Sequence, residues 1–215
     1  MEYIINSSQN KIIKYVKSLH IKKNGDEIGV YGAEGIKICY EALRNNEEIK
    51  FAIFNENYME NKELYNLMND IKVMGMGVYI INNKLFSDIS EMETPQGVML
   101  VISKKDYSKI ISYNKEKMNI IILDGIKDPG NLGTIIRTAD AFKADAILLS
   151  KGCVDLYNSK TIRSTMGSIF HIPIIDNVQL SELLQQIKNS GFKLIGADPH
   201  ADVDISDVIK HEKTA

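Results

Sequence analysis

Segments with the apolar pattern of strands alternate with helix-like segments along nearly the whole chain, and no other feature constrains the fold as strongly. In residues 1–103 we expect strands at 28–33, 51–54, 78–81 and 98–102, and helices at 7–20, 35–44, 57–69 and 84–89. Later in the chain we expect strands at 119–124, 146–149, 172–175 and 192–196, and helices at 132–142, 161–167, 180–189 and 204–210. This alternation predicts an α/β protein with mostly parallel sheet and right-handed crossovers.

A polar, lysine-rich stretch divides the alternation into two units. Residues 104–118 are only weakly periodic and are typical of an inter-domain linker that is partly helical, so residues 1–103 and 119–215 form the two predicted domains. Two small domains also fit a length of 215 residues. The second domain opens with the unbroken apolar run 119–124, which is typical of a strand buried on both faces.

The charge of the chain excludes a protein that is basic overall, so any nucleic-acid partner must meet a local patch. There are 26 basic and 28 acidic residues, for a net charge of −2. The lysines of the first predicted helix, among them Lys11 and Lys14, either face solvent or contact RNA phosphates. Lysine makes up 23 of the 26 basic residues. The remaining three, Arg44, Arg137 and Arg163, therefore mark positions where the planar guanidinium group is used.

Nothing in the sequence indicates a membrane protein, an exported protein or a metal site. No run of 18 apolar residues is present, and the N-terminus lacks a basic segment followed by a long apolar one. Cys39 and Cys153 fit no metal or redox spacing, which predicts reduced thiols in a cytosolic protein. The four histidines lack zinc-ligand spacing, and residues 198–204 lack the glycine and glutamate of a calcium loop. We therefore expect a cytoplasmic protein without a bound metal.

The first candidate site is the turn between the strand that ends at Asp124 and the helix after it. This Gly- and Pro-containing turn places backbone N–H groups and the positive end of a helix at the carboxyl edge of the sheet, where an anion can bind. Asn131 stands near the start of this helix, and Arg137 projects from its first two turns. The spacing is neither a dinucleotide-binding motif nor a P-loop. Taken alone, it also fits a plain strand-to-helix turn with a solvated arginine.

The second candidate site, residues 155–173, follows another strand and so returns to the same edge of the sheet. It is rich in hydrogen-bond donors: Asn158, Ser159, Lys160, Arg163, Ser164 and Thr165. Clustered donors without nearby carboxylates suit a phosphate or an RNA backbone. A capped polar helix has the same composition, so this alternative stays open.

Together the two stretches resemble the SpoU, or TrmH-like, family of RNA ribose 2′-O-methyltransferases, within the knotted SPOUT class. The family's first motif, Asn-x-Gly-x-x-x-Arg-Thr-Ala, is matched by Asn131, Gly133, Arg137, Thr138 and Ala139. The second is matched between residues 158 and 173, with Asn158, Lys160, Arg163, Ser164, Gly167 and Phe170 in the family's order. The stretches 7–10, 34–35 and 94–97 resemble the family's N-terminal RNA-binding domain, which is similar to small α/β ribosomal proteins.

The resemblance implies a fold, a reaction and a set of site residues. It implies an RNA substrate-binding domain at 1–103 and a parallel-sheet SPOUT methyltransferase domain at 119–215. The implied reaction transfers a methyl group from S-adenosylmethionine to a ribose 2′-hydroxyl in structured RNA, above all ribosomal RNA, and the implied assembly is a homodimer. The implied residues are Arg137 and Asn131 for catalysis, Ala197 and Asp198 for the cofactor, and Lys11, Lys14, Asn158, Lys160, Arg163 and Ser164 for RNA.

One feature of the family is missing from the sequence. The third motif, a Gly-Asn-Glu-x-x-Gly stretch, and the C-terminal segment that ties the knot and holds S-adenosylmethionine should begin just after Ala215. We therefore expect a C-terminally truncated sequence that lacks the knot-forming segment and binds the cofactor weakly or not at all.

Two other functions stay open on the sequence alone. A non-catalytic RNA- or ribosome-binding protein could keep this fold without the cofactor site, and cofactor binding separates it from an enzyme. An unrelated α/β nucleotide-binding enzyme would share the alternation of strands and helices. Protection of 2′-oxygens from alkaline cleavage, seen only with both protein and methyl donor, separates that enzyme from a methyltransferase.

Overall fold

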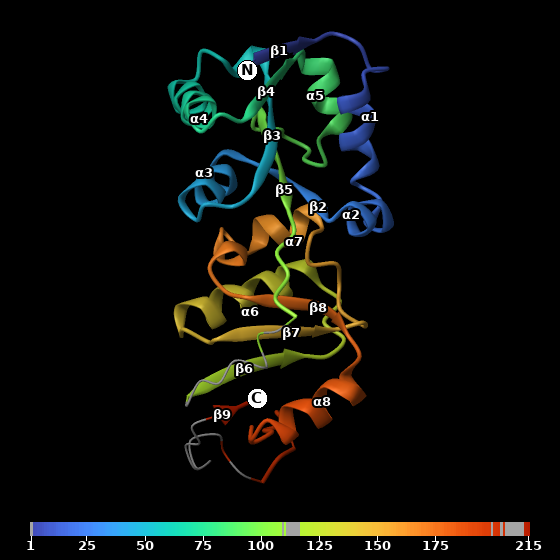
Figure 1. Ribbon diagram of the computed structural model, residues 1–215, viewed down its shortest axis with the longest axis vertical. Helices are drawn as coiled ribbons and strands as arrows, with labels where there is room; N and C mark the ends of the chain where they lie inside the picture. Colours follow the sequence, from blue (N-terminus) through green and yellow to red (C-terminus); the bar gives the residue numbers. More distant parts are fainter. Residues whose placement is uncertain (1, 109, 111–116, 199, 203, 205–212) are drawn as a thin grey trace.

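The chain folds around two sheets that follow one another along the long axis of the molecule (Figure 1). The computed structural model describes residues 2–108, 110, 117–198, 200–202, 204 and 213–215. Residues 205–210 of the predicted helix and part of the predicted linker lie outside these residues. The α/β fold class is confirmed.

The first sheet is mixed and has five strands in the order β1-β4-β3-β5-β2. Their bounds are β1 Glu2–Ile5, β2 Val30–Glu34, β3 Ile49–Asn55, β4 Gly77–Ile81 and β5 Val98–Ser103. β1, β4 and β3 run parallel, whereas β5 is antiparallel to both of its neighbours, β3 and β2. The sequence predicted the other four strands but missed β1, which lies at one edge of the sheet and is mostly exposed.

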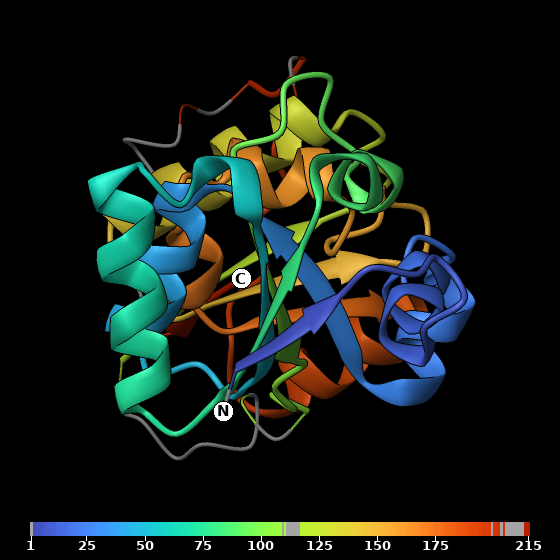
Figure 2. The same cartoon turned by 90° about the horizontal axis from the view of Figure 1, so that it is seen from above.

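Helices cover both faces of this sheet (Figure 2). The helices are α1 Lys11–Ser18, α2 Lys22–Ile28, α3 Ile36–Arg44, α4 Lys62–Val73 and α5 Asn83–Ile89, with a short 3₁₀ turn, η1, at Glu56–Tyr58. α3 and α4 pack on one face, and α1 and α5 on the other. The predicted helix at 7–20 is shorter than expected because Asn10 caps α1, its side chain accepting the backbone N–H of Ile12 at 2.8 Å. α2 was not predicted.

The second sheet is parallel throughout, in the order β8-β7-β6-β9. Its strands are β6 Met118–Leu123, β7 Ala146–Ser150, β8 Ile174–Val178 and β9 Lys213–Thr214. β7 is buried along its whole length, but the last three residues of β6 are only half-buried. The expectation that residues 119–124 are buried on both faces is therefore wrong, because β9 pairs only with the first two residues of β6.

The predicted strand at 192–196 is also wrong. The segment forms a single bridge, from Lys193 to Thr214, with backbone hydrogen bonds from Lys193 and Ile195 to residues 213–215, and it is β9 that pairs with β6. The remaining elements are α6 Pro129–Ala141, α7 Ser159–Ser164, α8 Leu180–Asn189 and a 3₁₀ turn, η3, at Ser168–Phe170. Apolar residues of α6 and α7 pack on one face of the sheet, and those of α8 on the other.

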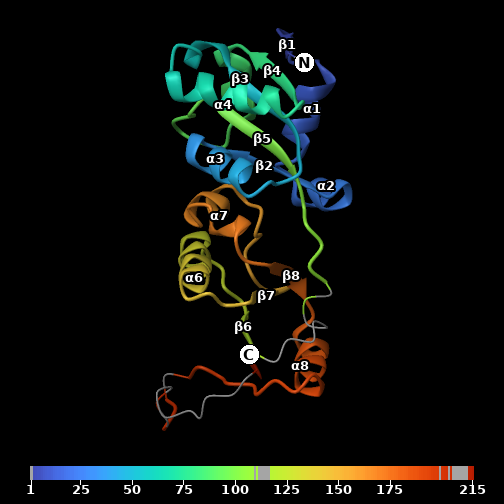
Figure 3. The same ribbon diagram turned by 60° about the vertical axis from the view of Figure 1, so that its left-hand side comes forward.

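The two sheets share one hydrophobic core, which continues across the contact between the domains. This core contains Ala33 of β2 and Ile162 of α7 together with buried residues of α3, α6 and β7. α7 packs directly against β2, as the side view shows (Figure 3). The helix that carries the second sequence motif therefore rests on the N-terminal domain.

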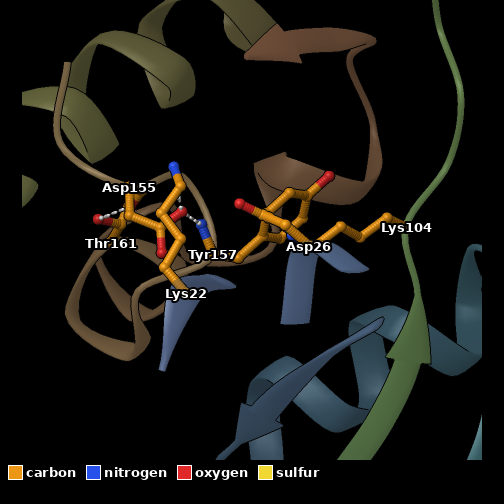
Figure 4. Close-up of polar contacts among 6 residues, drawn as sticks. All are labelled: Lys22, Asp26, Lys104, Asp155, Tyr157 and Thr161. Atoms are coloured by element: carbon orange, nitrogen blue, oxygen red, sulfur yellow. Dashed lines mark hydrogen bonds and ion pairs between the residues drawn. The ribbon is translucent and has the colours of Figure 1, made fainter. Parts of the chain in front are cut away.

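Polar contacts hold the domains together beside this core (Figure 4). Lys22 of α2 lies 3.3 Å from the carboxylate of Asp155, which also accepts the backbone N–H of Tyr157. Lys104 pairs with Asp26 and lies 4.3 Å from the centre of the Tyr157 ring. The N-terminal half of the chain thus contacts the loop before α7 through both charge and aromatic surface.

Candidate active site

The first motif lies on α6, whose N-terminus is fixed by Asp128. The Asp128 carboxylate accepts the backbone N–H of Asn131 at 2.7 Å, and Pro129 occupies the first helical position. The helix therefore begins three residues earlier than the sequence predicted, and Asn131 stands in its exposed first turn. Because the carboxylate also neutralises part of the positive helix end, Asp128 competes there with any bound anion.

Replacing Asp128 with alanine is expected to lower the free energy of unfolding by about 1 kcal/mol, because the first turn of α6 loses its side-chain cap. Asn61 provides the matched control, since it caps α4 in the other domain. Denaturant unfolding should show a similar loss for Asp128→Ala and Asn61→Ala. Hydrogen exchange in the first turn of α6 should rise only in the former, and equal exchange in both would contradict the assignment of the cap.

α6 and α7 approach so closely that only glycine fits between them. A Cβ atom on Gly133 would lie 1.9 Å from the Ser164 hydroxyl oxygen and 2.6 Å from the Ser164 carbonyl carbon. The Ser164 hydroxyl lies within hydrogen-bond distance of the Pro129 and Thr161 carbonyls, at 2.8 and 2.7 Å. The glycine of the first motif thus allows the second motif to pack against the first turns of α6.

Arg137 is exposed on α6 and lines a wide surface hollow of about 530 Å³. The hollow is lined by Thr134, Arg137, Thr138, Asp140, Ala141, Phe142 and Ser168. Asn131 is not among these residues, because six positions along a helix turn its side chain about a third of a turn away from Arg137. The structure therefore places the two predicted catalytic residues on one helix but on different faces.

A histidine connects the rim of this hollow to the N-terminal domain. His171 Nδ1 lies 2.8 Å from a carboxylate oxygen of Asp140, and its Nε2 lies 3.5 Å from one of Glu41 on α3. The backbone turns sharply just before this histidine at Gly167, which has φ +102°, and a Cβ there would lie 2.7 Å from Glu41 Cγ. Gly167 of the second motif is therefore required by both backbone conformation and close contact with α3.

The four residues of α7 predicted to contact RNA fall into two groups. Asn158 and Lys160 are exposed at the start of the helix, where the Asn158 side chain accepts the backbone N–H of Lys160 at 2.9 Å. Arg163 and Ser164 are half-buried and turn toward α6 and the N-terminal domain, and one terminal guanidinium nitrogen of Arg163 is buried. Lys11 and Lys14 are exposed on α1.

The carboxyl ends of β6 and β7 are tied together, and the segment predicted to hold the cofactor lies apart from the hollow. The Gly125 N–H donates to the Ser150 hydroxyl at 3.1 Å, and Lys127 donates to the Gly152 carbonyl. Ala197 and Asp198 are exposed in an irregular segment and do not line the Arg137 hollow.

A methyl-donor pocket needs an enclosing apolar surface with a few placed polar groups. Ala197 and Asp198 are exposed and supply at most one open side of such a pocket. They do not by themselves fit S-adenosylmethionine.

Within the described residues, no three His, Cys, Asp or Glu side chains group closely enough to hold a metal. None of the helices seen in those residues combines the length and apolar character needed to span a membrane.

Sequence reasoning missed Asp128, Asp140 and His171. The Asp-Pro pair before α6 is a helix-start signal that could have identified Asp128. No local pattern marks Asp140 or His171, because their contact joins α6 to the segment after η3, 31 residues apart in the chain.

Family models match both halves of the chain. The SpoU rRNA Methylase family matches residues 118–215, and the MRM3-like substrate binding domain matches residues 10–100. The Bacillus subtilis 23S rRNA (guanosine(2553)-2′-O)-methyltransferase RlmP is 33% identical over 192 residues, which cover 89% of this chain and 72% of that protein. The human mitochondrial rRNA methyltransferase 3 is 37% identical over 113 residues, covering 50% of this chain and 27% of that protein.

Solved structures of rRNA methyltransferases have a fold similar to that of this chain. An rRNA methyltransferase from Sinorhizobium meliloti superposes with a TM-score of 0.84 at 29% identity, covering 99% of this chain and 80% of the other. A second structure of that enzyme, with AdoMet bound, gives a TM-score of 0.83. These similarities extend through both domains, and the chain belongs to the SpoU rRNA methylase family.

Proposed function

We propose that this protein transfers a methyl group from S-adenosylmethionine to a ribose 2′-hydroxyl of ribosomal RNA. The observation that carries the proposal is the exposed Arg137, held over an open hollow by the close packing of the two family motifs at Gly133 and Ser164. The specificity of RlmP makes the guanosine equivalent to position 2553 of 23S rRNA the first target to test.

In this proposal Arg137 acts on the RNA rather than as a proton acceptor. A guanidinium stays protonated near neutral pH, so it cannot serve as a general base there. It can hold the phosphate beside the target nucleotide and stabilise negative charge as the hydroxyl oxygen attacks. S-adenosylmethionine supplies an already activated methyl group when bound, so the protein's contribution is mainly alignment.

The exposed residues of both domains are proposed to bind the RNA backbone. Lys160 at the start of α7 and Lys11 and Lys14 on α1 are exposed cations. Asn131 is proposed to order the first turn of α6. RNA contacts of Asn158, Arg163 and Ser164, cofactor contacts of Ala197 and Asp198, and a cytoplasmic location stay predictions.

The test is methyl transfer from tritiated S-adenosylmethionine to a transcript of the 23S rRNA hairpin that carries the candidate guanosine. We expect tritium in the RNA and resistance of that one linkage to alkaline cleavage. A matched transcript with a deoxyguanosine at the target should accept no methyl group. Methylation of the deoxy transcript would place the methyl group on a base, and RNA binding without transfer would favour the non-catalytic alternative.

We also propose that the protein is a homodimer in which Phe142 lies at the interface. Phe142 borders the Arg137 hollow and is 84% exposed. A large apolar side chain with this much exposure at the edge of a hollow favours an interaction surface.

Sedimentation at tens of micromolar should show a dimer that Phe142→Asp converts to monomer, because the introduced charge would be buried without a partner. Val73→Asp is the matched control, since Val73 is 87% exposed on α4 in the other domain. It should leave the dimer intact. A monomeric wild type, or an unchanged dimer in Phe142→Asp, would contradict the proposed interface.

A further inference from the structure

The most deeply buried carboxylate beside the second motif belongs to the N-terminal domain. Glu34, the last residue of β2, is only 4% exposed. One of its oxygens, Oε1, accepts the Ser90 hydroxyl at 2.6 Å. The other, Oε2, is buried and is one of two side-chain atoms of this kind that have no hydrogen-bond partner among the described residues. Burial raises the pKa of Glu34, so its charged form is disfavoured unless something compensates.

The second such atom is Nη1 of Arg163 on α7. α7 packs against β2, which ends at Glu34, so the two unpaired atoms lie at the same domain contact. They are chemically complementary, since one is a carboxylate oxygen and the other a guanidinium nitrogen. The positive charge of Arg163 also lowers the pKa of Glu34 and so opposes the effect of burial.

Two buried polar atoms without partners are costly, and the cost falls when each satisfies the other. A small cavity of about 30 Å³ lies beside Glu34, between the domains, and is lined on the α7 side by Ser159. That volume accommodates one water molecule beside the Glu34 carboxylate, although Arg163 does not itself line the cavity. Charge and burial at the contact of α7 with β2 therefore point to the pairing.

We infer that Glu34 is a positioning residue for Arg163. Its carboxylate holds the Nη1 side of the guanidinium toward the N-terminal domain and leaves the opposite edge of the fork for an RNA phosphate. Because Arg163 precedes Ser164, which is packed against Gly133, Glu34 connects the substrate-binding domain to the helix that carries Arg137. The inference rests on the proposed function, because it assigns a role in RNA binding to this pair.

Glu34→Gln tests the pairing, with Glu91→Gln as the matched control. Glu91 lines the same small cavity but is exposed, so its replacement removes a nearby negative charge without touching the buried pair. The wild-type chain has only three arginines, so an NMR spectrum of guanidinium groups contains few signals, and Arg163→Lys identifies the one of interest. We expect slow rotation of the Arg163 guanidinium in the wild type and in Glu91→Gln, and fast rotation in Glu34→Gln.

RNA affinity provides the second measurement, with the hairpin transcript described above as the probe. We expect Glu34→Gln to weaken binding about tenfold and to reduce the slope of log affinity against log salt concentration by about one, because one phosphate contact is lost. The same change in an Arg163→Lys background should have no further effect. Glu91→Gln should bind as the wild type does.

Thermal unfolding separates this role from a merely structural one. The pKa of Glu34 is raised in the folded state, so its contribution to stability falls as the pH rises through that raised pKa. Glutamine removes this penalty but also removes the charge that faces Arg163, so Glu34→Gln should melt only slightly lower than the wild type at pH 7 while it loses RNA affinity. A lower melting temperature with unchanged RNA affinity would overturn the inference.

The NMR measurement also separates failure of this inference from failure of the proposed function, because it needs neither RNA nor methyl donor. Unchanged guanidinium rotation in Glu34→Gln would overturn the pairing even if the protein methylates RNA. A rotation that depends on Glu34, in a protein that transfers no methyl group, would support the pairing and refute the proposed reaction.

Discussion

Gly133→Ala is expected to destabilise the protein by about 3 kcal/mol or more and to abolish methyl transfer. The new Cβ would lie 1.9 Å from the Ser164 hydroxyl oxygen and 2.6 Å from the Ser164 carbonyl carbon, so α6 and α7 could no longer pack as they do. For a chain of this size, that loss corresponds to a fall of roughly 10 °C in the melting temperature. Calorimetry and the methyl-transfer assay measure the two effects.

Two further variants show whether the helix contact is responsible. Gly196→Ala should be neutral, because a Cβ at that position meets no atom within 4 Å. Adding Ser164→Gly to Gly133→Ala removes the side chain but not the carbonyl carbon, so the second change should not restore stability. A Gly133→Ala protein with normal stability and activity would show that α6 and α7 can separate without harm.

Arg137→Lys is expected to reduce the rate of methyl transfer by about 10²–10³ while leaving the fold intact. The side chain is exposed, so the change costs little stability, but lysine keeps the charge and loses the fork that can hold phosphate and hydroxyl together. Single-turnover kinetics at saturating RNA and donor measure the effect.

Arg44→Lys provides the control for Arg137→Lys, because Arg44 is an exposed arginine on α3 whose carboxylate partner, Glu41, lies on the same helix. It should retain the wild-type rate. A wild-type rate in Arg137→Lys would mean that position 137 supplies only charge, or nothing, to the reaction.

The sequence predicted most elements because their signals are local. Two helices illustrate this, the one with Asn131 and Arg137 and the one with Arg163. In each case a buried strand and the capping residue of the helix lie within about twenty positions of one another. The family motifs then predicted which helices carry the site. In the structure α6 packs against α7, and the roles of the individual side chains stay predictions.

What could not be predicted depends on contacts between distant parts of the chain. The short sequence of β1 does not by itself indicate a strand. Its pairing partner, β4, lies more than seventy residues later in the chain. The segment at 192–196 has the composition of a strand, but β9 takes its place beside β6. The burial of Glu34 at the domain contact is not visible either, because no short-range pattern reveals which carboxylate a domain interface buries.

The hydrophobic core that Ala33 and Ile162 share has a consequence for how this protein becomes functional. α7 packs on α6 of its own half of the chain and also on β2 of the other half, so both halves contribute to holding the second motif in place. The shared core therefore links the order of the second motif to the folding of the N-terminal domain.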